Sequence, residues 1–274
     1  MTRGVGAGCL LGLTLALAAC SSDVRIIRDQ AEARWREGNY DDAIRLNTLL
    51  YERDHQGKYA AQALLNIGNI YYLNLRQLRN AIDTYKRLVE EMPGRPEEIR
   101  ARRQLASIYA NEIGDLTQAI TQYEKILESE DLPDRQEVEL LRADAYLKKD
   151  ERDRALRELR RIEESGISGH FADQVYLKIG NIYQMQNKTD DATAYFSRVT
   201  ASPCIECRRR ALLHLMETYE AVYDYDRAIA TVKRLDPSPE NDQRIAREVR
   251  RLNDKRARVE SGVVLNWEHK RSRR

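Results

Sequence analysis

The pentapeptide Ile67-Gly68-Asn69-Ile70-Tyr71 recurs unchanged as Ile179-Gly180-Asn181-Ile182-Tyr183. Both copies belong to a longer periodic pattern, in which a Tyr recurs at intervals of 38, 37, 37 and 36 residues. The Tyr positions are Tyr71, Tyr109, Tyr146, Tyr183 and Tyr219. A second series follows these Tyr residues by 9 or 10 positions and opens one repeat earlier: Ala43, Ala81, Ala119, Ala155, Ala192 and Ala228. Spacing this regular indicates six tandem repeats.

The spacing within each repeat is typical of two amphipathic helices. A small residue lies three positions before each of the first four Tyr residues, as Gly180 does before Tyr183, so small residue and ring share one helix face. These small residues are Gly68, Ala106, Ala143 and Gly180, and Ala31 is their counterpart in the first repeat. The second helix carries apolar residues four and seven positions after its Ala, as in Ala192, Phe196 and Val199. Because small residues allow two helices to cross closely, we expect antiparallel helix pairs that bury their apolar faces against neighbouring pairs.

This pattern resembles the tetratricopeptide repeat family, whose motif Gly-x-x-Tyr, turn, Ala-x-x-x-Phe and Pro recurs with a period of about 34 residues. The best match is formed by Gly180, Tyr183, Ala192, Phe196 and Pro203. The resemblance covers residues 25–239 and implies an all-α fold. The expected architecture is a right-handed α-solenoid of about six helix pairs, closed by a capping helix over residues 240–259.

The turns inside the repeats differ in length. Gly38 and Gly114 each lie five residues before the Ala of their repeat, where a Gly is suited to the positive φ that follows a helix. Repeats two and three carry one extra residue between their small residue and their Ala. The sequence predicts a longer turn there, which is either surface variation or a binding loop.

Residues 1–19 have the pattern of a bacterial export signal, with Arg3 before an apolar stretch too short to span a bilayer. Leu17-Ala18-Ala19-Cys20 resembles the lipobox of bacterial lipoproteins, which implies cleavage before Cys20 and acylation of its sulfur. An ordinary signal peptide with an incidental Cys is the alternative. A lipidated linker over residues 20–24 would follow. Ser21 after the Cys implies, by the enterobacterial sorting pattern, an outer-membrane lipoprotein that faces the periplasm.

The C-terminal segment is the basic end of the chain. Residues 240–274 contain 11 Lys and Arg against 6 Asp and Glu, whereas the whole chain has a formal net charge of only +2. This balance gives no reason to expect nucleic acid as a partner. Ile245, Val249 and Leu252 form one apolar stripe on a charged helix, as in a solvated cap. The basic tail, residues 260–274, either folds back on this cap or contacts a partner.

The sequence contains no motif of enzyme chemistry. Its four His residues lie far apart, and there is neither a Gly-rich phosphate loop nor a Gly-x-Ser-x-Gly elbow. We therefore expect a protein that is not an enzyme and that uses no cofactor, metal or small-molecule substrate. An envelope enzyme is the rival from another class, and it would need a cleft with convergent titratable groups.

Cys204-Ile205-Glu206-Cys207 is the one pair of closely spaced thiols, and it lies at the start of a helix. A disulfide, a redox dithiol and half of a metal site are three possible interpretations. A redox dithiol would lack the βαβ context of thioredoxin-like motifs, and a metal site would lack ligands because only His214 is nearby. The disulfide is favoured for an exported chain.

The first helices of tetratricopeptide pairs line a groove that binds partners beside the small residue. The corresponding positions here are Asn69, Tyr72, Arg103, Ser107, Asp144, Asn181, Gln184 and Glu217. Asn69 and Asn181 resemble the Asn of repeats that clamp a peptide C-terminus, but Leu65 and Leu177 replace the clamp Lys. A terminal carboxylate is therefore not the expected ligand, and an Asn that makes only local hydrogen bonds is the alternative.

The lipobox and the repeats together resemble the lipoprotein of the outer-membrane β-barrel assembly machine. Pilotins, which are lipoproteins that escort a secretin to the outer membrane, also use six such repeats. Either resemblance implies a lipid-anchored periplasmic scaffold that binds protein partners or peptide segments during envelope biogenesis.

Overall fold

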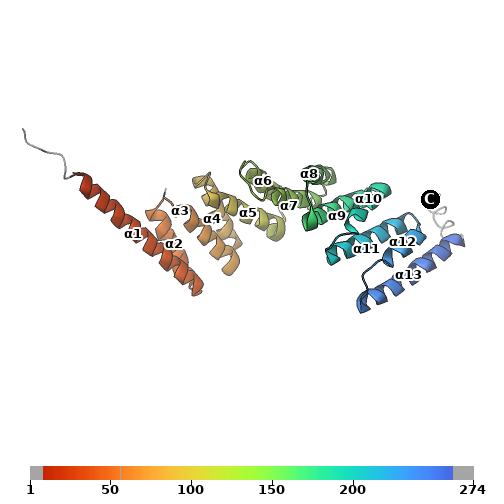
Figure 1. The fold of residues 1–274 in the computed structure, drawn as a ribbon. Coiled ribbons are helices and arrows are strands. Elements are labelled where there is room, and N and C mark those ends of the chain that lie inside the picture. Colours follow the sequence, from red (N-terminus) through yellow and green to blue (C-terminus); the bar gives the residue numbers. More distant parts are fainter. Residues whose placement is uncertain (1–8, 56, 262–274) are drawn as a thin grey trace, which may run out of the picture. The chain divides into compact units, whose positions relative to one another are not determined.

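A computed structural model describes residues 9–55 and 57–261 of the chain, with side chains from residue 23 onward (Figure 1). Every regular element in this part of the chain is helical, which confirms the predicted all-α class. The helices follow one another as six pairs and a last helix: α1 (Cys9–Arg36) and α2 (Tyr40–Arg53); α3 (Ala60–Asn69) and α4 (Leu78–Glu91); α5 (Pro96–Ser107) and α6 (Leu116–Leu127); α7 (Arg135–Lys148) and α8 (Arg152–Glu164); α9 (Gly169–Met185) and α10 (Thr189–Val199); α11 (Ile205–Ala221) and α12 (Tyr225–Val232); α13 (Pro239–Glu260).

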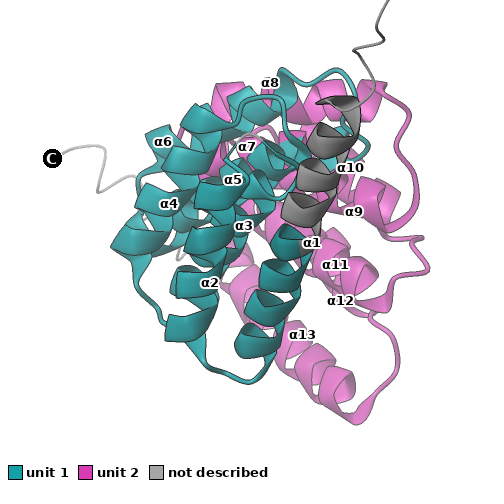
Figure 2. Ribbon diagram, turned by 90° about the vertical axis from the view of Figure 1, so that its left-hand side faces the viewer, with its two compact units in different colours: residues 1–138 teal, residues 139–274 magenta. Residues whose placement is uncertain are grey.

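The chain divides into two compact units, residues 1–138 and residues 139–274 (Figure 2). The first unit contains α1 to α6 and the start of α7, and the second contains the remainder of α7 and α8 to α13. Within each unit the two helices of a pair pack on one another, as α1 does on α2 and α9 does on α10.

The Ala series lies in the core of both units, because all six of its members are 0% exposed: Ala43, Ala81, Ala119, Ala155, Ala192 and Ala228. The Tyr series is less uniform. Tyr109, Tyr146 and Tyr183 are buried, whereas Tyr71 and Tyr219 are only half-buried. The Tyr position is therefore a core position in three repeats and a half-buried one in the other two.

Gly68 and Gly180 lie against an aromatic ring of the paired helix. A Cβ on Gly68 would lie 2.4 Å from Tyr85 Cε1, and one on Gly180 would lie 2.5 Å from Phe196 Cε1. Both rings are fully buried. The close helix crossing predicted from the small residues is thus a direct contact between glycine backbone and ring.

The turn inside every pair contains a residue in the left-handed conformation, five positions before the buried Ala. Its φ lies between 55° and 80° in all six repeats, and the residues are Gly38, Arg76, Gly114, Asp150, Asn187 and Tyr223. Only the two glycines were recognisable as such from sequence. The next residue caps the second helix, and Asn39, Asp115 and Asp224 do so with a side-chain oxygen.

The extra residue of repeats two and three is not in the turn. It is accommodated within the first helix, because α3 continues as a π-helix, η1 (Ile70–Asn74), and α5 continues as η2 (Ile108–Ile113). In η1 the Leu75 N–H donates to Ile70 O, five residues back, at 3.0 Å. Since a π-helical bond absorbs one more residue than an α-helical bond, the prediction of a longer turn was wrong.

The two ends of the chain fall partly outside the described residues. Residues 1–8 of the expected export signal and residues 262–274 of the expected basic tail lie outside them. Cys20 and the expected linker, residues 20–24, fall within α1. None of the described helices is both long enough and apolar enough to cross a membrane.

The last helix, α13, packs on α12 through the stripe seen in the sequence. Leu252 is fully buried, and Ile245 and Val249 are half-buried against the same cluster. Glu220 on α11 accepts bonds from Arg251 Nη2 at 2.6 Å and from Lys255 Nζ at 2.6 Å. The hydrogen bonds from Arg251 hold the pKa of Glu220 below its usual range, although partial burial acts in the opposite direction.

Candidate functional site

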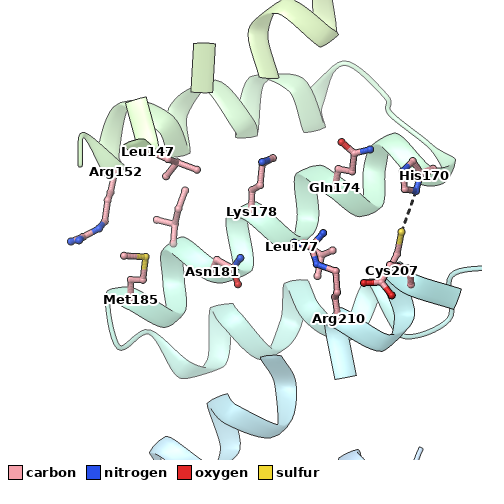
Figure 3. Close-up of a pocket in the computed structure, with 12 residues that line it drawn as sticks. Leu147, Arg152, His170, Gln174, Leu177, Lys178, Asn181, Met185, Cys207 and Arg210 are labelled. Carbon is pink, nitrogen blue, oxygen red and sulfur yellow. Dashed lines mark hydrogen bonds between the residues drawn. The ribbon is translucent and has the colours of Figure 1, made fainter. Parts of the chain in front are cut away.

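A cavity of about 400 Å³ lies in the second unit beside α9. α7 and α8 contribute one side, α11 contributes another, and α9 supplies most of the lining (Figure 3). Its lining residues are Leu147, Arg152, His170, Gln174, Leu177, Lys178, Asn181, Ile182, Met185, Glu206, Cys207 and Arg210. Both apolar and polar side chains line the cavity, which suits a ligand that has both kinds of group.

The α9 part of the lining is one helix face. His170, Gln174, Lys178, Asn181 and Met185 are separated by four, four, three and four residues, the spacing that places side chains above one another. Figure 3 shows these side chains in sequence along the helix.

The charge of the cavity is mainly positive. Lys178 Nζ pairs with Asp144 Oδ1 at 2.6 Å, and Arg152 pairs with Asp150 at 2.6 Å. Glu206 is the one acid of the lining, and it pairs with Arg209 at 2.8 Å. Arg210 has no ion-pair partner among the described residues. It therefore remains a cation that an acidic group of a ligand can neutralise.

Two buried polar atoms of cavity residues have no hydrogen-bond partner in the described structure: Asn181 Oδ1 and Arg152 Nε. A buried polar atom without a partner costs about 1–3 kcal/mol, so such atoms are uncommon in folded proteins. One is an acceptor and the other is a donor.

The origin of the unpartnered Asn181 is visible in the other copy of the pentapeptide. There Tyr85 OH donates to Asn69 Oδ1 at 2.7 Å. Tyr85 and Phe196 stand at the same place in their repeats, four residues after the buried Ala, and each ring contacts the Gly beside its Asn. Phe196 has no hydroxyl group. Asn181 consequently lacks the donor that its counterpart has.

Comparison with known proteins supports the repeat pattern. Sequence profiles of the tetratricopeptide repeat match residues 28–96 and residues 174–202. The chain contains tetratricopeptide repeats. No curated protein sequence matches it.

Solved tetratricopeptide structures share the fold. The C-terminal part of a TPR repeat-containing protein from Cytophaga hutchinsonii gives a TM-score of 0.64 at 18% identity, over 80% of this chain and 86% of that one. PilW, a type IV pilus biogenesis factor, gives 0.51 at 14%, over 80% and 97%. YrrB, a TPR protein with an unusual peptide-binding site, gives 0.53 at 16%, over 73% and 97%. At these identities the likeness shows the fold alone.

Of the eight predicted groove positions in the tetratricopeptide repeats, Asn181 alone lines the cavity. Asp144 borders it through its pair with Lys178, and Gln184 is half-buried on α9. The others have local partners: Asn69 with Tyr85, Tyr72 with Glu112 at 3.4 Å, Arg103 with Asp134 at 2.6 Å, Ser107 with Asn111 at 3.4 Å, and Glu217 with His214 at 3.5 Å.

Most residues of the cavity lining were not predicted from the sequence. Gln174 and Lys178 lie seven and three residues before Asn181, so the helical period could have identified them as its neighbours on α9. Arg152 and Arg210 come from other repeats, and no spacing along the chain points to them.

The thiol pair lies at one end of this cavity. The structure joins Cys204 and Cys207 by a disulfide, with their Cα atoms 5.2 Å apart. The neighbouring imidazole is His170, whose Nδ1 lies 3.1 Å from Cys207 Sγ (Figure 3). His214 instead stacks on Phe196, at 5.2 Å between ring centroids. The sequence-based choice of His214 as the nearby imidazole was therefore wrong, because the packing of consecutive repeats brings α9 next to α11.

Proposed function

We propose that this tetratricopeptide protein is a non-catalytic docking scaffold that binds an extended segment of a partner protein in the α9 cavity. The observation that carries the proposal is the pair of unpartnered atoms, Asn181 Oδ1 and Arg152 Nε. Every residue of an extended peptide, proline excepted, offers both an N–H and a C=O group. Both atoms are shielded from solvent in the unbound chain, so rotation of the Asn181 amide and of the Arg152 side chain would be needed for such a segment to donate to the one and accept from the other.

The other lining residues favour a particular kind of segment. Leu147, Leu177 and Met185 provide apolar surface for its side chains, and Met adapts its shape to different partners. Arg210 and Lys178 favour an acidic side chain among them. The expected ligand is therefore an extended peptide with apolar residues and at least one Asp or Glu.

The proposal includes a location in the bacterial envelope. Acylation of Cys20 would anchor the chain at the outer membrane, since three acyl chains exceed the two signals that stable anchoring needs. Cys20→Ala should move the protein to the soluble fraction, whereas a mature protein that retains Met1 would contradict the anchor. Assembly of outer-membrane proteins is the proposed pathway, and escort of a secretin or pilus component is the alternative.

The binding site can be tested by restoring the missing donor. In Phe196→Tyr the new hydroxyl should reach Asn181 Oδ1 as Tyr85 OH reaches Asn69, so partner binding should weaken by about fivefold or more, the equivalent of one hydrogen bond. Tyr85→Phe is the matched control, because it makes the opposite change in the other copy and should leave binding unchanged. The ligand is found by capturing partners from membranes with the acylated full chain and identifying them by mass spectrometry. Peptides of the captured partner are then used to measure the affinity of each variant.

A second pair of variants tests the charge of the cavity. Arg210→Glu should weaken binding at least tenfold, whereas Arg227→Glu, on α12 and outside the lining, should have little effect. Equal binding by all four variants would place the docking site elsewhere. Substrate turnover by the purified protein would contradict the non-catalytic role.

A further inference from the structure

A second cluster of side chains shares His170 and Cys207 with the cavity lining, and its proposed role does not rest on peptide docking. His170 Nδ1, Cys204 Sγ and Cys207 Sγ lie within 4.8 Å of one another, where the first turn of α9 meets the start of α11. Cys207 is buried and His170 is exposed. Two sulfurs and one imidazole are the ligands that soft and borderline cations such as Zn²⁺ prefer.

One tetrahedral ion fits among the three side chains once the disulfide is reduced. Bond lengths of about 2.3 Å for Zn–S and 2.0 Å for Zn–N place neighbouring ligand atoms about 3.5–3.8 Å apart. His170 Nδ1 and Cys207 Sγ are 3.1 Å apart, so small side-chain movements are enough. The two sulfurs must separate from their disulfide distance, which requires reduction.

The backbone around the cysteines is already arranged for thiolates. Cys204 is the N-cap of α11, and the Cys207 N–H donates to Cys204 Sγ at 3.1 Å. The N–H groups at the start of a helix stabilise negative charge. Ser202 Oγ accepts from the Cys204 N–H at 3.0 Å and bonds to the buried Asp173, which fixes the loop before α11.

We propose that the reduced form of this protein binds one thiophilic divalent cation through Cys204, Cys207 and His170. Two electrons from a dithiol reductant, which becomes a disulfide itself, convert the bridge into two thiols. Binding of the cation releases both thiol protons to water, while the Nδ1 lone pair of His170 forms the third bond and its Nε2 keeps the ring proton. Oxidation to the disulfide excludes the cation.

The fourth coordination position faces the cavity. His170 and Cys207 both belong to the cavity lining, so water or a donor from another molecule has access to the ion. Three protein ligands and an accessible fourth position distinguish such a site from a closed structural zinc site, which has four protein ligands.

Cobalt is the probe for the test, because tetrahedral Co²⁺ with thiolate ligands absorbs visible and near-ultraviolet light. The full chain, reduced by a phosphine and kept without oxygen, should bind one Co²⁺ with thiolate charge-transfer absorption, and Zn²⁺ should displace it. His170→Ala should weaken Zn²⁺ binding at least about tenfold, and Cys204→Ser with Cys207→Ser should abolish the absorption. The disulfide form should bind no cobalt.

Matched variants separate this site from other thiols and from misfolding. His214→Ala removes an imidazole on α11 that is not in the cluster. The affinity of this variant for Zn²⁺ should equal that of the wild type. In the unprocessed chain the double serine variant retains Cys9 and Cys20, so cobalt–thiolate absorption in that variant would overturn the proposal. Absence of binding by the reduced wild type, or unchanged affinity in His170→Ala, would overturn it as well. Circular dichroism of the metal-free variants verifies that each one folds.

Discussion

Identical residues in the two pentapeptides have different neighbours. Asn69 accepts a bond from Tyr85, whereas Asn181 has no partner in the described structure, and the residue that corresponds to Tyr85 in its repeat is Phe196. The pentapeptide could be found from sequence, and so could the helix face shared by its Gly and Tyr. The hydrogen-bond partner of each Asn could not be predicted from the sequence, because it depends on one hydroxyl group of the paired helix.

Gly180 provides the residue-scale prediction for stability. Its added Cβ would lie 2.5 Å from the fully buried Phe196 ring, and overpacking of a core costs about 1–3 kcal/mol. Ala gains up to about 1 kcal/mol over Gly in helix propensity. Gly180→Ala should therefore lower the free energy of unfolding by about 1–2 kcal/mol in urea denaturation.

A double-mutant cycle with Phe196→Leu identifies the cause of that loss. The two effects should be less than additive, since a smaller side chain leaves space for the new methyl group. Strict additivity would show that the loss has another origin.

The helices and turns have two regular features that the spacing of residues in the sequence did not predict. The Ala spacing revealed that repeats two and three have an extra residue, yet the chain absorbs it as π-helix in η1 and η2. The number of residues in a repeat can be read from the sequence, but the carbonyl group to which each N–H donates cannot. Four left-handed turn residues also went unrecognised, because they are not glycines: Arg76, Asp150, Asn187 and Tyr223.

Arg76 tests the turn element. It is exposed and has a φ of 55°, a conformation that costs a residue with Cβ about 1–2 kcal/mol. Arg76→Gly removes that cost and adds about 0.4–1 kcal/mol of unfolded-state entropy. Urea denaturation should therefore show that the free energy of unfolding of Arg76→Gly is higher by about 0.5–1 kcal/mol. Arg76→Ala should show no increase. A destabilised Arg76→Gly would contradict the strained turn.

The capping helix α13 should be sensitive to pH through Glu220. Because the folded protein lowers the pKa of this carboxyl group, its contribution to stability is present above the unfolded pKa of about 4.3 and is lost as pH falls through the folded value. Glu220→Gln should reduce the free energy of unfolding by about 1–2 kcal/mol at pH 7. That difference should shrink below about pH 4.

Glu217→Gln is the control for the Glu220→Gln variant. Glu217 is an exposed carboxylate on the same helix, and its substitution should change stability by less than about 0.5 kcal/mol. A pH-independent effect of Glu220→Gln would mean that shape and not charge holds α13 in place.

At the scale of the whole molecule, the repeats of the second unit form one cavity, for which we propose a partner, and one thiol cluster beside it. The number of pairs, the Ala core and the cap followed from periodicity, because the hydrophobic effect acts on every repeat in the same way. The cavity did not follow from it. Its residues come from four helices, and the side chains that distinguish it are those in which the repeats differ.

Photocrosslinking in living cells tests the docking claim most directly. A photoreactive residue at Met185, which is 59% exposed and lines the cavity, should form a covalent adduct with the partner protein. The same residue at Val222, which is 45% exposed on the second unit but outside the lining, should form none. Phe196→Tyr should reduce the Met185 adduct. Adducts from Val222 alone, or equal adducts from both positions, would contradict binding in the α9 cavity.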